Sequence, residues 1–136
     1  MSYAATAALQ EAVFSALSND SNVVTLSAGA IYDAIPPGDV PSLYISLGPE
    51  TARDASDVME AAALHEFLVK IVSDEAGFHS AKRLAAAVSD VLTDANLALS
   101  RGTLAGLRFR RARARKSGDL REIDLWFRAF IDSSAA

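Results

Sequence analysis

The sequence predicts an α+β fold of two layers, with a mainly antiparallel sheet of four to five strands and two main helices packed on one face. Three observations predict it. Two stretches repeat apolar residues at the period of a helix, and β-rich segments lie between them. The closing residues indicate a long C-terminal β-hairpin. The chain has 136 residues, of which 51% are hydrophobic and 22% charged, so we expect a single domain over residues 1–136 with a buried core.

The two helices are expected over residues 4–17 and from about residue 75 or 78 to 92. In the first helix, apolar residues recur at helical spacing between Leu9 and Leu17, which places them on one face. In the second, the apolar stripe begins at Phe78, and Ser73-Asp74 are expected to cap the N-terminus. Between the first helix and the first strand, the pattern allows a short helical turn followed by a short extended piece.

Strands are expected at residues 43–47 and 64–72 and in the hairpin arms, 104–116 and 120–131. Gly48-Pro49 should end the first of these strands, because both residues favour turns. Residues 50–60 mix small and charged side chains without an apolar period, which predicts a long mobile loop. The connection that follows the second helix allows a further short strand at residues 97–99.

The register of the hairpin stays open between two alternatives. A three-residue loop ending at Gly118 sets apolar side chains of the two arms beside each other, Leu107 and Phe109 with Leu125 and Phe127. A two-residue loop, Ser117-Gly118, pairs opposite charges instead, Arg111 with Asp124 and Arg113 with Glu122. We favour the first alternative because it segregates the apolar side chains.

The composition excludes several classes of function. The chain has no cysteine, and therefore no disulfide, thiolate nucleophile or Cys-ligated zinc. Its first twenty residues hold no basic residue, and no stretch reaches the roughly 18 apolar residues of a membrane span, so we expect a soluble intracellular protein without a membrane partner. His65 and His79 lack metal-binding spacing, and the seven glycines form no phosphate loop. His65 shares a strand face with apolar residues and is interpreted as a histidine at the edge of the core. We expect no enzyme, no metal and no cofactor.

The charge is divided unequally along the chain. Residues 1–100 hold four basic and thirteen acidic residues, a net −9, whereas residues 101–136 hold nine basic and four acidic residues, a net +5. This division is typical of a chain with one acidic and one basic surface. It allows nucleic-acid binding by the basic part, or association of the basic part with the acidic part of a neighbouring copy.

Most of the basic residues belong to one run, which comprises Arg108, Arg110, Arg111, Arg113, Arg115 and Lys116. On a strand, such a run projects planar donors that suit phosphates or carboxylates. Three interpretations stay open: a solvated hairpin, a DNA-binding β-ribbon, or a contact with another protein subunit. Trp126 and Phe130 lie on the strand face opposite the aliphatic row, where aromatic residues beside arginine are typical of an interface. Alternatively, the Pro-rich segment and the long loop cover these two rings.

The order of these segments resembles the tail terminator (tail completion) proteins of long-tailed phages and phage-like gene transfer agents. The opening segments LQEAVFSAL (9–17), AIYDAIP (30–36) and PSLYIS (41–46) carry the resemblance, together with the closing Asp124-Leu125-Trp126-Phe127-Arg128. It spans nearly the whole chain. The motifs are patterns of size and order rather than a catalytic signature, and the density of arginine at 108–116 is high for the group.

The resemblance implies a structural role at the head–tail junction of a virion or phage-like particle, assembled in the cytoplasm. Such proteins form a homohexameric ring that caps the tail tube protein, stops its growth and binds the head connector or stopper protein. DNA would pass through the lumen without specific binding. By this implication, Arg53, Asp54 and Asp57 contact the tail tube from the loop. The subunit or connector interface would comprise Arg108, Arg110, Arg111, Arg113, Arg115 and Trp126. The alternative function is a small nucleic-acid-binding protein that uses the hairpin residues 108–116.

Overall fold

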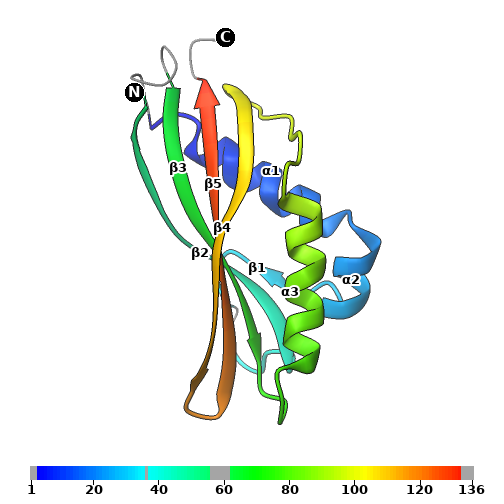
Figure 1. Cartoon of the computed structure of the whole chain (residues 1–136). Helices are drawn as coiled ribbons and strands as arrows, with labels where there is room; N and C mark the ends of the chain where they lie inside the picture. Colours follow the sequence, from blue (N-terminus) through cyan, green and yellow to red (C-terminus); the bar gives the residue numbers. More distant parts are fainter. Residues whose placement is uncertain (1–2, 36, 56–61, 133–136) are drawn as a thin grey trace.

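The computed structural model describes residues 3–35, 37–55 and 62–132 of the chain, and the strands of this part form one sheet in the order β1-β2-β3-β5-β4 (Figure 1). The strands are β1 (Ile31–Tyr32), β2 (Leu43–Asp54), β3 (Ala62–Ser73), β4 (Thr103–Ser117) and β5 (Leu120–Asp132). β1 runs parallel to β2, and the other neighbours are antiparallel. The predicted α+β fold with a mainly antiparallel sheet and a long C-terminal hairpin is confirmed.

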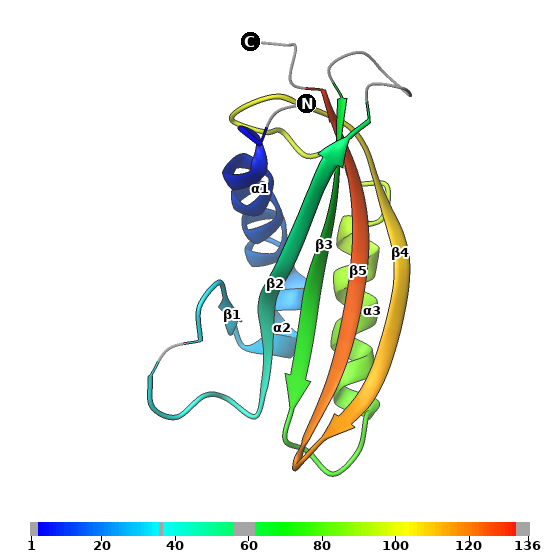
Figure 2. The ribbon, with the colours of Figure 1, turned by 90° about the vertical axis from the view of Figure 1, so that its left-hand side faces the viewer.

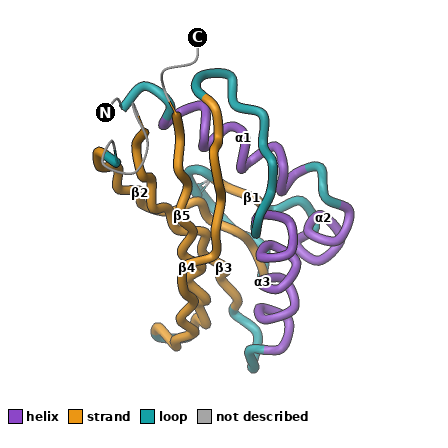
Figure 3. The backbone as a smooth tube through the Cα atoms, turned by 45° about the horizontal axis from the view of Figure 1, so that its top comes forward, coloured by secondary structure: helices purple, strands orange, loops and turns teal. Residues whose placement is uncertain are grey.

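The helices of the described residues, α1 (Thr6–Ser18), α2 (Ser21–Ser27) and α3 (His79–Leu92), cover one face of the sheet (Figure 2). Figure 3 shows the same two layers from above, with the helices on one side of the strands. The main core lies between these layers. It joins Leu9 and Leu17 of α1 and Leu84 of α3 to Ile71 and Phe127 of the sheet, each nearly inaccessible to solvent. No helix among the described residues is long and apolar enough to cross a membrane.

The N-termini of α2 and α3 differ in whether a side chain accepts a hydrogen bond from a backbone amide. The Asp20 side chain accepts a hydrogen bond of 3.0 Å from the Val23 amide and so caps α2. The cap expected for α3 is wrong, because the Ser73 hydroxyl accepts from the Glu75 amide at 3.1 Å in the turn before the helix. α3 begins only after Phe78, which makes no capping hydrogen bond through its side chain. Residues 97–99 form no strand.

The first long strand does not end where the sequence predicts. β2 continues through Gly48-Pro49 to Asp54, with an irregularity in its pairing to β3 between Leu47 and Glu50. This bulge accommodates Pro49, which has no amide hydrogen to give to a ladder. A Cβ at Gly48 would lie 3.0 Å from the Leu68 side chain, so glycine allows the close approach of the two strands. The expectation of a mobile loop from residue 50 is therefore wrong for residues 50–54.

Candidate protein–protein interface

The β4–β5 hairpin closes through a turn that neither predicted register contains. Ser117 pairs with Leu120, so the two connecting residues are Gly118 and Asp119. Gly118 has a φ of 60°, in the left-handed region that glycine adopts at little cost and that two-residue hairpin turns require. The last residues before the turn are therefore paired, and the strand carries its arginines to the end of the hairpin.

Both predicted registers are wrong because the turn lies at Gly118-Asp119, and two bulges in β4 then change the register further along the hairpin. The pairing shifts between Leu104 and Gly106 and again between Phe109 and Arg111, so β4 carries one extra residue at each point. Between the two bulges, Phe109 lies opposite Phe127, and their ring centroids are 5.9 Å apart. Near the turn, the register places Arg113 opposite Asp124 and Arg115 opposite Glu122, and Arg115 forms the ion pair. Apolar segregation and charge pairing thus both occur, in different halves of the hairpin.

The face of the sheet away from the helices carries the aromatic residues Trp126 and Phe130. Because Phe127 points into the core, its neighbour Trp126 points to the opposite face. There the Arg111 guanidinium lies 5.6 Å from the centroid of the Trp126 ring. Phe130 packs on Ala55 at the end of β2, together with Ala62 and Leu64. The prediction that both aromatic residues lie away from the helices is confirmed, and Phe130 is partly covered by the segment after β2.

One arginine of the run is held by a charge cluster on this face. Arg115 Nη2 lies 2.8 Å from Glu122 Oε1, and its Nε lies 3.5 Å from Asp124 Oδ2. Lys70 approaches the same two carboxylates at 3.7 and 4.0 Å. The carboxylate side chains are only 13% and 12% exposed. Arg115 therefore belongs to an internal network and is less available to a partner.

Among the described residues, three arginines of the run contact neither a carboxylate nor the Trp126 ring. Arg108, Arg110 and Arg113 are exposed, and in the described part of the chain no carboxylate lies within ion-pair distance of them. Arg110 is the extra residue at the second bulge. Since β4 is the last strand of the sheet, these guanidinium groups lie along a free edge. We call β4 with these three arginines the basic edge.

The predicted tail-tube residues lie at the other end of the sheet. Arg53 and Asp54 are the last residues of β2, paired with Leu64 and Ala63, and so belong to a strand rather than a loop. Both are exposed. Asp57 lies outside the described residues. Figure 2 shows the end of β2 at one end of the sheet and the hairpin turn at the opposite end, so the two predicted contact regions do not form one site.

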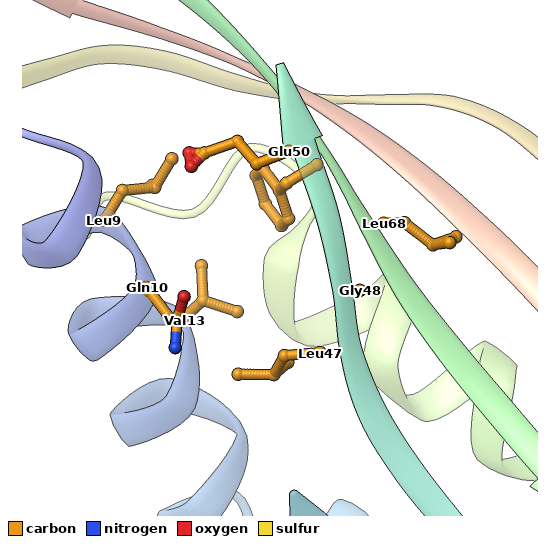
Figure 4. A pocket seen from close by; sticks show the side chains of 8 residues that line it. Leu9, Gln10, Val13, Leu47, Gly48, Glu50 and Leu68 are labelled. Carbon is orange, nitrogen blue, oxygen red and sulfur yellow. The ribbon is translucent and has the colours of Figure 1, made fainter. Parts of the chain in front are cut away.

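His65 of β3 contacts Glu50 of β2, a pairing that the sequence does not predict. His65 is fully buried, and its Nδ1 lies 3.3 Å from Glu50 Oε2. Its Nε2 has no hydrogen-bond partner among the described residues. Figure 4 shows the Glu50 side chain extending from β2 towards Leu9 of α1, above a cavity of about 30 Å³. The alternation of His65 with Phe67 on β3 predicted the burial, but Glu50 was expected in a loop.

Two surface grooves flank the sheet at its opposite edges. The α1–β2 groove has a volume of about 370 Å³ and is lined by Ala7, Gln10, Glu11, Phe14, Asp33 and Leu47. The α3–β4 groove, of about 390 Å³, lies between Lys82 and Ala86 of α3 and Ala112 and Ala114 of β4. Its wall includes Phe109. The first groove holds two acidic residues and no basic residue, whereas the second holds a lysine and no acid.

Comparison with solved structures defines the class of protein to which this chain is similar, a component of a virion. A chain in the structure described as the virion of native gene transfer agent (GTA) particle is 51% identical and superposes with a TM-score of 0.89. The match covers 96% of this chain and 99% of that chain. No curated protein sequence matches.

A family model identifies the kind of virion component more narrowly. Residues 11–132 match the family model of the tail completion protein gp17. The chain belongs to this family of tail completion proteins, which confirms the resemblance predicted from the sequence. It is a structural protein of the tail in phage-like particles.

Proposed function

We propose that the protein assembles into a homohexameric ring that ends the tail tube and joins it to the head connector or stopper protein. One observation carries this proposal: the two edges of the sheet differ in charge. The basic edge of β4 lies at one end of the strand order, and the α1–β2 groove with Glu11 and Asp33 lies beside the other. Unlike edges favour a head-to-tail contact, and such contacts close into a ring when the rotation between subunits divides a full turn.

The two ends of the sheet suit two different partners. We assign Arg53, Asp54 and Asp57 to contact with the tail tube protein. Arg108, Arg110, Arg111, Arg113 and Arg115, with Trp126, are assigned to the subunit or connector interface. Exposed guanidinium groups without an internal carboxylate bind a partner's carboxylates at the least cost, which favours Arg108, Arg110 and Arg113 among these. Arg111 and Trp126 act together as a packing anchor.

The proposed role is mechanical and includes no catalysis and no cofactor. DNA passes through the lumen of the ring without specific binding, so acidic groups are expected to line it. His65, whose Nδ1 lies 3.3 Å from Glu50 Oε2, is fully buried. Its burial favours a structural role for this histidine.

Particle morphology tests the proposal. Cells that produce particles with the triple change Arg108→Glu, Arg110→Glu, Arg113→Glu are expected to form tails that are over-long or lack heads. A matched control reverses two exposed charges away from the proposed contacts, at Arg83 and Arg101. Electron microscopy measures tail length and the fraction of tails joined to heads. Normal joined tails in the β4 variant, or in Trp126→Ala, Arg111→Glu, would contradict the interface assignment.

The nucleic-acid alternative is decided by the same triple variant. If the basic edge binds DNA, a gel shift with the natural chain falls steeply with salt and disappears in the variant. If it binds protein, the natural chain gives no shift at low salt, while light scattering shows a hexamer, alone or with tube ends. We expect the second result.

A further inference from the structure

We propose that α1 of one subunit inserts Phe14 into the α3–β4 groove of the next copy of this chain. The inference rests on the proposed ring and specifies which surfaces meet in it. Phe14 is 41% exposed on the outer side of α1, where it contributes little to the core of its own subunit. On the helix surface its neighbours are Gln10 and Glu11, four and three residues earlier. The phenyl ring of Phe14 therefore lies beside the Glu11 carboxylate.

The α3–β4 groove has the shape that receives such a ring. Ala112 and Ala114 lie on the helix-facing side of β4 but are exposed, because β4 is the edge strand of the sheet. Opposite them, α3 contributes Ala85 and Ala86. Small side chains on both walls leave a hollow of about 390 Å³ above the buried Leu125. Unfilled apolar surface of this kind is stabilised when another apolar side chain covers it.

Charge complementarity selects a second copy of this chain as the occupant. The groove is bordered by Lys82, and Arg110 follows Phe109 on the same edge. The surface around Phe14 instead carries Glu11 and Asp33. Bringing α1 of one copy to the groove of another therefore places acids beside bases at the rim of an apolar contact.

The placement of the two surfaces sets the symmetry of the contact. α1 flanks the β2 edge and the groove flanks the β4 edge, at opposite ends of the strand order. A subunit can therefore donate Phe14 on one side and accept a second Phe14 on the other. This is a heterologous contact, which propagates around a ring, whereas a two-fold contact would stop at a dimer.

Cysteine cross-linking in assembled particles tests this pairing directly. The natural chain has no cysteine, so Phe14→Cys with Ala112→Cys introduces the only thiols of the protein. Particles that carry the double variant are purified, oxidised and separated on a non-reducing gel. We expect a ladder of covalent oligomers that ends at the hexamer, and no oligomer from either single variant. Both positions are exposed, so the changes leave the core intact.

A matched control separates the groove from the rest of the strand. Phe14→Cys with Ala105→Cys places the second thiol at another exposed alanine of β4, near its opposite end, and should give no ladder. Dimers from Phe14→Cys alone would show a two-fold contact and overturn the proposal. A six-fold ring in electron microscopy without a ladder from the first pair would also overturn it, while leaving the ring itself intact. Particles of the natural chain that lack a six-fold ring would refute the proposed function and this inference together.

Discussion

Replacing Arg115 with methionine should destabilise the fold, whereas the same change at Arg113 should not. The two arginines lie on the same strand and face, but only Arg115 contacts carboxylates, at 2.8 and 3.5 Å. Its removal leaves Glu122 and Asp124, which are 13% and 12% exposed, with Lys70 as the remaining cation. Charges 4 Å apart interact by about 4 kcal/mol near a protein surface. Since the Arg115 side chain is 35% exposed, solvent screening reduces the expected loss to about 1–2 kcal/mol.

Urea unfolding followed by the fluorescence of the single tryptophan measures this difference. Arg113→Met should change the free energy of unfolding by no more than about 0.5 kcal/mol. Arg115→Met should lower the free energy of unfolding by about 1–2 kcal/mol relative to it. Methionine keeps most of the alkyl stem at both positions, so the comparison isolates the guanidinium group. Equal losses in the two variants, or a larger loss for Arg113→Met, would refute the assignment of Arg115 to an internal network.

Three further predictions concern the sheet. Burial, and then the negative charge of Glu122, raise the pKa of Tyr44 above 10.0, so the unfolded chain loses this proton first. Stability should be full below pH 10 and fall as pH rises further, and Tyr44→Phe should show a smaller fall in alkaline urea titrations. Phe127→Ala should cost about 3–5 kcal/mol in calorimetry, because the ring is fully buried; a loss below 1 kcal/mol would contradict the packing. Gly48→Ala should cost about 1–3 kcal/mol through contact with Leu68 at 3.0 Å, and Leu68→Ala should relieve part of that strain.

Local sequence patterns were sufficient to predict the helices and strands that bury one apolar face. The helical period of α1 and the alternation of β5 predicted both elements to within a few residues, and the face of Trp126 followed from that alternation. The extension of β2 to Asp54 could not be predicted in this way. Its outer residues are polar or small, so the apolar period is missing, and the strand exists because the long β3 supplies backbone partners.

Long-range strand pairing also determines the register of the hairpin and the positions of the candidate interface residues. Nothing local marks Arg110 as the extra residue of a bulge, yet this bulge turns Arg111 towards Trp126 and leaves Phe109 against Phe127. The charge asymmetry was visible in the sequence, but its direction was not. Only the strand order shows that the basic strand and the acidic α1–β2 groove lie at opposite edges.

The free edge of β4 presents a problem that its arginines solve in a specific way. A long unpaired strand is a template for pairing with a second copy of itself. Here Arg108, Arg110 and Arg113 would meet the same groups of that copy, and like charges directly opposite each other are destabilising. The two bulges further reduce the length of regular edge. The same arginines therefore oppose a two-fold contact through β4 and favour a neighbour that presents carboxylates, which is the condition for a head-to-tail assembly.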